Sequence, residues 1–339
     1  MSPREEISPP RKALVTGATG FVGAAVARKL LDEGVQVRAL VRKGTDRGNL
    51  AGLDIEVVEG DLRQQETLEV ACQGCDALFH VAADYRMWVP KPAEIYASNV
   101  EGTRGVLLAA RSAGIRRAVY TSSVGVLGIP EDGRPGDETT PVSLDDMIGH
   151  YKRSKFQAEE VARQINAEGE LEVVIVNPST PIGPRDIKPT PTGRMVVDAG
   201  KGAMPAFVDT GLNVVHVEDV AEGHWLAWRH GRAGRRYVLG GTDMSLRQIL
   251  EQVSEMVGRK SPTVEIPHAA ALAIAKAAQA VARLTGKPPV ATVDEVQMSR
   301  KKMYFSSARA GAELGYAPRP AQAALRDAVE WFRAQGYLN

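Results

Sequence analysis

Short apolar runs alternate with helical patterns over the first 178 residues, and this alternation limits the fold more than any other feature. The runs are KALVTG, VQVRALVR, DIEVVEGD, DALFHVAA, IRRAVYTSS and LEVVIVNP, at residues 12–17, 35–42, 54–61, 76–83, 115–123 and 171–178. Strands buried on both faces are apolar throughout, and parallel neighbours need helical crossovers. The pattern therefore predicts an α/β fold with a doubly wound parallel sheet of six strands.

A glycine-rich loop follows the first of these runs and opens a helical pattern at residues 21–33. In TGATGFVG, Gly17 permits a tight turn, Gly20 lets the backbone approach a pyrophosphate, and Gly23 allows close packing of helix on strand. Helix N-termini attract phosphate because their N–H groups are unpaired. Strand, glycines and helix stand in the order that a dinucleotide site requires.

The chain divides at residue 178, where the alternation ends. Residues 179–193 are rich in Pro and Gly and predict a loop, whereas residues 212–228 and 236–241 predict a strand running into a helix and a further strand. We expect a dinucleotide-binding Rossmann domain at residues 12–178 plus about 212–241. A substrate lobe would use about residues 179–211 and 242–339. Residues 1–11 are polar and proline-containing, and predict a disordered tail.

Composition excludes several other classes of protein. The 339 residues include 44% hydrophobic residues, and 42 Lys and Arg against 41 Asp and Glu leave a net charge of +1, so nucleic acid is not expected as a partner. Cys72 and Cys75 are the only cysteines, which excludes a disulfide scaffold, leaves no second pair for a zinc site and suits the cytoplasm. The Ala-rich residues 269–284 predict a buried amphipathic helix, with contact to a membrane surface as a lesser alternative.

The end of the second predicted strand indicates which dinucleotide binds. An NAD enzyme places an acidic residue there, about 20 residues past the glycines, but this chain has Arg42 and Lys43, with Arg38 on the same strand face as Arg42. A guanidinium suits a 2′-phosphate, so NADP(H) is favoured and NAD(H) remains an alternative. Asp61, at the end of the third strand, is expected to accept from the adenine amino group.

A Tyr and a Lys stand four positions apart in YKRSK, at residues 151–155. On a helix they share one face with a rise of roughly 6 Å between them. Together with the glycine loop, HVAA at 80–83 and TSS at 121–123, this spacing resembles the extended short-chain dehydrogenase/reductases. The resemblance is strongest to the dihydroflavonol-4-reductase-like branch, and specifically to the bacterial proteins named hopanoid-associated sugar epimerases. It is carried by FHVAADYRMW, DETTPVSLDDMIGHYKRSKFQAEE, NPSTPIGPRDIKPTPTGRMVVD and DTGLNVVHVEDVAEGH.

The resemblance implies a role for each matching residue. Tyr151 would be the catalytic acid, Lys155 its partner and ribose ligand, Ser123 the donor to the substrate oxygen, and Asn99 a structural or proton-relaying residue. His80 is more simply a packed core histidine. The residues expected at the cofactor are Gly17, Thr19, Gly20, Phe21, Val22, Arg42, Lys43, Asp61, Leu62, Val81, Ala82, Ala83, Tyr151, Lys155 and Pro178. Those expected at the substrate, unless they only pack the lobe, are Tyr85, Met87, Trp88, Met147, Ser179 and Met195.

A phenol beside an ammonium has a chemical rationale in hydride transfer. A ketone gains negative charge on oxygen as hydride arrives, and a free phenol with a pKa of about 10 is poorly matched to acid-base work near neutrality. We expect Lys155 to lower the pKa of Tyr151. A shift of about three units requires roughly 4 kcal/mol of differential interaction.

Three functions remain open at this stage. Epimerases of this type generally carry Arg-Asp where this chain has Leu212 and Asn213, so the sequence favours an NADPH-dependent oxidoreductase acting on an apolar ketone or secondary alcohol. A sugar epimerase or dehydratase is the alternative, and a non-catalytic dinucleotide-binding regulator comes last. The resemblance also implies a homodimer through helices at about residues 93–112 and 150–166. A lipid substrate would imply loose membrane association.

Overall fold

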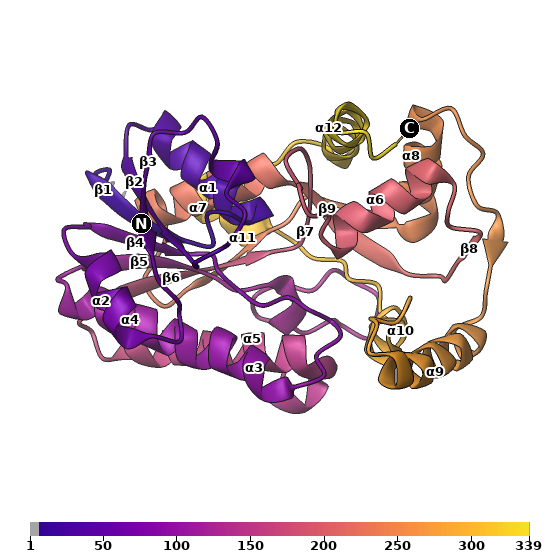
Figure 1. The fold of residues 1–339 in the computed structure, drawn as a ribbon, viewed down its shortest axis with the longest axis horizontal. Coiled ribbons are helices and arrows are strands. Elements are labelled where there is room, and N and C mark those ends of the chain that lie inside the picture. The colour runs from indigo at the N-terminus through magenta and orange to yellow at the C-terminus, as the bar shows by residue number, and fades with distance from the viewer. Residues whose placement is uncertain (1–6, 339) are drawn as a thin grey trace.

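The computed structural model describes residues 7–338, which form a dinucleotide-binding domain with a smaller lobe beside it (Figure 1). The central sheet has seven parallel strands in the order β10-β6-β5-β4-β1-β2-β3. Their bounds are β1 Lys12–Thr16, β2 Gln36–Val41, β3 Ile55–Glu59, β4 Ala77–His80, β5 Arg117–Thr121, β6 Glu172–Pro178 and β10 Arg236–Leu239. The predicted doubly wound sheet is confirmed, and β10 is its seventh strand.

Helices cover both faces of this sheet, because alternate residues of each strand point to opposite sides. In β1, Ala13 and Val15 face one core while Leu14 faces the other. The first core lies under α1 Phe21–Asp32, α7 Val217–His230 and α11 Ala308–Leu314. The second lies under α2 Gln65–Cys72, α4 Gly102–Ser112 and α5 Gly149–Ala167.

The lobe is built on a second, three-stranded sheet in the order β11-β9-β7. Its strands are β7 Thr180–Ile182, β9 Gly211–His216 and β11 Thr242–Ser245, and β8 Ala206–Phe207 pairs with β12 Val264–Glu265. Its helices are α6 Pro191–Lys201, α8 Leu246–Met256, α9 His268–Thr285, α10 Val293–Met298 and α12 Ala321–Ala334. Three of them, α6, α8 and α12, enclose an apolar core of their own.

The structure differs from the predicted domain boundaries at three places. β9 joins the lobe sheet instead of the central one, and α11 returns to pack on α7 in the central domain. Of the predicted disordered tail, residues 1–6 lie outside the described residues. Residues 7–11 lie against the domain, since Ile7 N–H donates to Arg229 O at 3.2 Å and Trp228 Nε1 donates to Ser8 O at 3.4 Å.

The two cysteines lie in the core, and within residues 7–338 the helices are too short or too polar to cross a membrane. Cys72 and Cys75 are free and buried at the junction between α2 and β4, and burial raises the pKa of Cys72 to about 12. Both therefore behave as small core residues. Among residues 7–338, no helix combines the length and the apolar character that crossing a bilayer requires.

Candidate active site

The glycine loop joins β1 to α1 in a shape that only glycine allows. Gly17 has φ +74°, and a Cβ there would lie 2.8 Å from the backbone of Ala82; a Cβ at Gly23 would lie 2.1 Å from Gly17 O. At Gly20, which caps α1 with an extended backbone, a Cβ would meet only Gly17 O. The loop is therefore packed on its inner side and open at Gly20, where the N–H groups of α1 begin, and this arrangement fits a dinucleotide pyrophosphate.

A polar cavity of about 600 Å³ lies at the ends of β2 and β3, and Arg42, Lys43, Asp61 and Arg63 are among the residues that line it. Arg42 and Lys43 are exposed, and their side chains have no hydrogen-bond or ion-pair partner within residues 7–338. Asp61 is held by Arg63 at 2.9 and 2.7 Å, and this pairing lowers its pKa to about 2. The cavity thus presents two free cations and a carboxylate that stays ionised.

Arg38 does not join this cationic group, contrary to the sequence expectation. Its guanidinium pairs with Glu56 at 2.9 Å and donates to the carbonyl oxygens of Ala71 and Gln73 at 3.0 and 2.6 Å. The side chain therefore ties β2 to β3 and to the end of α2. Arg38 lies four residues before Arg42 in the chain, but its charge is already paired with Glu56.

Ser123 and Tyr151 come together from two separate elements. Ser123 follows β5, and its Oγ accepts the Gly125 N–H at 3.0 Å at the start of a short 3₁₀ turn, Val124–Val126. Tyr151 lies in the first turn of α5, close enough to the Ser123 side chain for that hydroxyl to lower the pKa of the phenol. Carboxyl ends of parallel strands are where ligands bind in doubly wound folds, so the two hydroxyls lie at the expected edge.

Lys155 lies one turn further along α5 and is 2% exposed. Its Nζ donates to Tyr120 Oη at 3.0 Å and to Thr121 O at 2.7 Å, and it lies 4.6 Å from the centre of the Tyr120 ring. Burial lowers its pKa from the usual 10.5 to about 7, an effect that the carboxylate of Glu159 partly offsets. The amine is therefore held at the strand end by Tyr120, a residue that the sequence analysis did not select.

The expected depression of the Tyr151 pKa is not found. Burial raises that pKa above its usual 10, and the hydrogen bond with Ser123 opposes the rise. The Nζ of Lys155 is bound to Tyr120 and Thr121, and desolvation of the phenol dominates. In this state the phenol keeps its proton near neutral pH.

Asn99 connects the loop after β4 to the catalytic helix. It lies in a π-helical turn, Ala97–Glu101, between α3 Pro92–Tyr96 and α4. Its Oδ1 accepts the Asp84 N–H at 2.7 Å, and its Nδ2 donates to Asp84 O and to Ser154 Oγ, both at 2.9 Å. Such turns interrupt α-helices most often at functional sites. Asn99 therefore fixes the loop that carries Tyr85.

The other residues expected at the cofactor lie around the strand ends. His80 is buried between Thr16 and Thr103, at 2.7 and 2.9 Å, and burial lowers its pKa to about 3, so it is the packed core histidine that the sequence favoured. Ala82 N–H donates to Thr16 Oγ1 at 3.2 Å, which sets the loop against Gly17. Thr19 belongs to the glycine loop, and Phe21 and Val22 begin α1. Leu62 contacts Gly102 of α4, and Pro178 ends β6. Val81 and Ala83 flank Ala82 in the chain.

The residues expected at the substrate differ in how exposed they are. Tyr85 is 48% exposed, whereas Met147 is 5% exposed. Met87 and Trp88 are half-buried in the loop before α3. Met195 packs against the core of the lobe, as the packing alternative held. Ser179 follows Pro178, and its Oγ is buried without a hydrogen-bond partner among the described residues. A buried hydroxyl without a partner is unusual, and a ligand bound at this edge of the sheet would supply its missing hydrogen bond.

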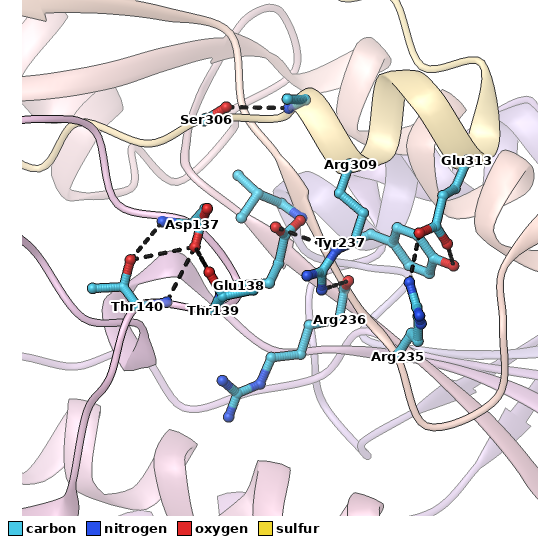
Figure 2. A network of polar contacts seen from close by, with 12 residues as sticks. Asp137, Glu138, Thr139, Thr140, Arg235, Arg236, Tyr237, Ser306, Arg309 and Glu313 are labelled. Atoms are coloured by element: carbon cyan, nitrogen blue, oxygen red, sulfur yellow. Dashed lines mark hydrogen bonds and ion pairs between the residues drawn. The ribbon is translucent and has the colours of Figure 1, made fainter.

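Glu159 is a buried carboxylate that the sequence analysis missed. Its Oε1 accepts Arg236 Nε at 2.5 Å, its Oε2 accepts Asn177 Nδ2 at 3.0 Å, and the same Nδ2 donates to Ser123 O at 3.0 Å. Figure 2 shows the guanidinium of Arg236 pointing away from the Glu138 side of β10. The i, i+4, i+8 spacing of Tyr151, Lys155 and Glu159 was the available signal.

A second buried carboxylate holds the loop that leads into α5 (Figure 2). Glu138 Oε1 accepts the Val238 N–H of β10 at 2.8 Å, and its Oε2 lies 3.7 Å from Arg309 Nε of α11. Burial raises the pKa of Glu138, which both contacts oppose. Residues from β10 and α11 therefore position the segment between Ser123 and Tyr151.

Lys152 is a second lysine at this site and was also missed. Its side chain passes over Gly125, and its Nζ lies 3.9 Å from Met303 Sδ, where Met303 bridges to Leu212. Burial, with Lys301 nearby, lowers its pKa to about 8. Asn213 brings no charge, since its side chain is a neutral amide that donates to Asp243 and to Phe305 O and accepts the Gly241 N–H. A cation is thus present near Leu212, although no Arg stands there.

Comparison with known families identifies the fold and the class of chemistry. Residues 13–240 match the model of the NAD dependent epimerase/dehydratase family. The chain belongs to that family. It is an NAD(P)-dependent oxidoreductase of the extended short-chain dehydrogenase/reductase type, as the sequence resemblance implied.

Three curated relatives match almost the whole chain. A Synechocystis sp. protein provisionally named dihydroflavonol 4-reductase is 45% identical over 96% of this chain and 95% of its own length. Sterol demethylase protein B of Methylococcus capsulatus is 35% identical over 96% and 99%. The 4-hydroxy-2-methyl-3-oxo-4-farnesyl-3,4-dihydroquinoline-1-oxide ketoreductase of Stigmatella aurantiaca is 33% identical over 91% and 92%.

Two solved structures share the architecture. The crystal structure of gox2253 is 50% identical, with a TM-score of 0.88 over 97% of this chain and 100% of its own. A nucleoside-diphosphate-sugar epimerase of Pseudomonas aeruginosa, PA4631, is 27% identical, with a TM-score of 0.80 over 97% and 99%. Reductase and epimerase names thus both occur among proteins similar to this oxidoreductase.

Proposed function

We propose that this protein is an NADPH-dependent carbonyl reductase that acts on a ketone, or in reverse on a secondary alcohol, of an apolar small molecule. The observation that carries the proposal is that Ser123, at the carboxyl end of β5, and Tyr151, in the first turn of α5, lie close enough for Ser123 to act on the pKa of the phenol, with Lys155 one turn away. Bound NADPH would supply the hydride. The two hydroxyls are then the groups available to the oxygen of the substrate.

Tyr151 suits the role of acid in this reduction. Its raised pKa keeps the phenol protonated near neutral pH, so it can donate a proton to the carbonyl oxygen as that oxygen gains charge. Ser123 donates a hydrogen bond to the same oxygen and keeps it beside the phenol. Hydride on carbon and a proton on oxygen complete the alcohol.

NADPH is favoured by the two free cations at the end of β2. Arg42 and Lys43 line the 600 Å³ cavity, whereas Arg47 and Arg63 are paired with Glu59 and Asp61. A 2′-phosphate accepts charge-assisted hydrogen bonds from a guanidinium. An apolar substrate is favoured by the names of relatives that refer to a sterol and to a farnesylated quinoline.

Replacing the phenol tests the chemistry. Tyr151→Phe should lower kcat for NADPH-dependent reduction of a panel of apolar ketones by about 100-fold or more, because positioned acids contribute roughly 10²–10⁴. Tyr96→Phe is the matched control, since within residues 7–338 its hydroxyl hydrogen-bonds His150, at 3.2 Å. Activity that survives in Tyr151→Phe would overturn the assignment.

Replacing the cation tests the choice of cofactor. Arg42→Ala should weaken NADPH binding by roughly 10- to 100-fold and leave NADH binding nearly unchanged, because one charge-assisted contact is worth about 1.5–3 kcal/mol. Arg47→Ala, which breaks only the pair with Glu59, is the control. Dinucleotide titration measures both, and an unaltered preference in Arg42→Ala would refute this account.

Sugar epimerisation is the second candidate. Lys152, with Lys301 nearby, gives this site cations near Leu212 that could meet a diphosphate, and PA4631 carries a nucleoside-diphosphate-sugar epimerase name. The two candidates differ in net redox change. Tightly bound NAD that purifies with the protein, together with sugar isomerisation and no consumption of NADPH, would decide for the epimerase.

A further inference from the structure

Helix α9, His268–Thr285, carries an exposed apolar stripe that the rest of the fold does not use. Its buried residues are Ala271, Ala275 and Ala282, which lie on one side. Ile274, Val281 and Leu284 are 55%, 58% and 88% exposed, and at 3.6 residues per turn they lie roughly 80 to 160° around the helix from the buried alanines, on one exposed flank. The expected buried helix is therefore buried along one side, at Ala271, Ala275 and Ala282, with Leu272 partly buried beside them.

Exposed alanines extend the same stripe, and an exposed valine follows the helix. Ala270, Ala273 and Ala277 are exposed at helical spacing with Ile274, and Val290, just beyond the helix, is 91% exposed. Exposed apolar residues scattered singly are normal on soluble proteins. A continuous row along four turns of one helix marks an interaction surface.

The charged residues on α9 and directly after it are basic. Lys276 and Arg283 are exposed, seven residues apart, on the same edge of the stripe, and Lys287 follows the helix. Residues 266–293 contain no Asp or Glu, although the whole chain has a net charge of only +1. A helix with an apolar face and basic flanks has the composition of helices that lie in the interface of anionic bilayers.

The position of α9 leaves this face free. Figure 1 shows α9 at the outer edge of the lobe, below α8 and beside α10, away from the central sheet. Through α10 it remains connected to the active site, because a Cβ at Gly149 would lie 2.7 Å from Asp294 Oδ2. Gly149 begins α5 two residues before Tyr151. A surface bound to α9 would thus lie close to the catalytic helix.

We propose that α9 docks this protein on the surface of an anionic lipid bilayer, with Ile274, Val281 and Leu284 in the interface and Lys276 and Arg283 facing the headgroups. A second copy of the chain is the competing occupant of the stripe. An α9–α9 contact would bring these basic side chains of two copies together, and residues 266–293 offer no carboxylate to pair with them. An anionic bilayer offers acyl chains to the apolar stripe and negative headgroups to the basic side chains.

Sedimentation of the full chain with vesicles tests the proposal without reference to any reaction. Vesicles containing phosphatidylglycerol should bind the protein, those of phosphatidylcholine alone should bind it much less, and high salt should release it. Leu284→Asp should weaken binding by about 10-fold or more, because burying a leucine is worth about 1.5–3 kcal/mol. The double variant Lys276→Glu/Arg283→Glu should weaken binding to these vesicles by at least about 5-fold for each basic residue removed, because a Lys or Arg near an anionic surface contributes about 1 kcal/mol.

Matched controls keep the outcome clear. Val70→Asp changes a valine that is 55% exposed, on α2 of the other domain, and Arg134→Glu changes an exposed loop arginine; neither should alter binding. All these positions are exposed, so circular dichroism should show folded variants. Equal binding to both kinds of vesicle, or undiminished binding of Leu284→Asp, would overturn the proposal. A shift of Leu284→Asp from dimer to monomer in sedimentation velocity would overturn it too, by assigning the stripe to a second copy.

Discussion

Lys155 shows how a single residue can be functional and costly to the fold at once. Its amine is almost fully buried, and the desolvation that lowers its pKa to about 7 exceeds the stabilising effect of Glu159. Near neutral pH it therefore exists in both protonation states. A group of this kind can change charge when a ligand arrives, which is typical of functional sites.

The buried amine predicts a particular dependence of stability on pH. Between about pH 7 and 10.5 the unfolded chain holds a proton on Lys155 that the folded chain has lost, so the free energy of unfolding contributed by this residue rises with pH across that window. Below pH 7 both states are protonated and the penalty of a buried charge is fully present. Urea unfolding of cofactor-free wild type and Lys155→Met should show the wild type gaining on the variant from pH 7 to pH 10. Parallel curves would show that this amine titrates normally.

Helix α5 organises the site by carrying one functional group per turn. Tyr151, Lys155 and Glu159 follow one another along one face, and Glu159 is clamped by Arg236 of β10 and by Asn177 of β6. Asn177 also holds the carbonyl of Ser123, so one network supports the helix and the serine loop together. We interpret Glu159 as a positioning residue that acts through Lys155.

This interpretation predicts a shift in a pH profile. Glu159 raises the pKa of Lys155, so Glu159→Gln should lower that pKa further and move the alkaline limb of kcat/KM to lower pH. Glu160→Gln, on the same helix with its side chain 45% exposed, is the control and should leave the limb in place. A uniform loss of activity without a shifted limb would show that Glu159 only supports the structure.

At the scale of the whole molecule, we propose that two copies associate through α4 and α5. A shallow hollow of about 340 Å³ lies between these helices, and Val100, Phe156 and Val161 are among the residues that line it. This face is separate from the stripe on α9, so the two surfaces can be tested independently.

A charged residue in that hollow tests the association. Phe156→Asp should shift the protein from dimer to monomer in sedimentation velocity, because it places an unpaired carboxylate in an apolar contact. Val70→Asp, on α2, is again the control. A wild-type monomer, or a dimer that tolerates Phe156→Asp, would contradict the proposal.

The sequence by itself determined what depends on neighbouring residues. Continuous apolar runs predicted the doubly wound sheet, and the three glycines predicted a tight loop in which Gly17 and Gly23 leave no room for a Cβ. The four-residue spacing placed Tyr151 and Lys155 on one face of a helix. Such features follow from local sterics and from the period of each element, which the order of residues specifies directly.

Only the tertiary structure decided which side chains meet across long distances in the chain. It paired Arg38 with Glu56 while leaving Arg42 free, and it brought Arg236 onto Glu159, 77 residues away. It also turned β9 into the lobe and exposed one face of α9. Burial, and with it the pKa of Tyr151 and Lys155, depends on what packs against a residue, and that is set by contacts between elements that no local pattern contains.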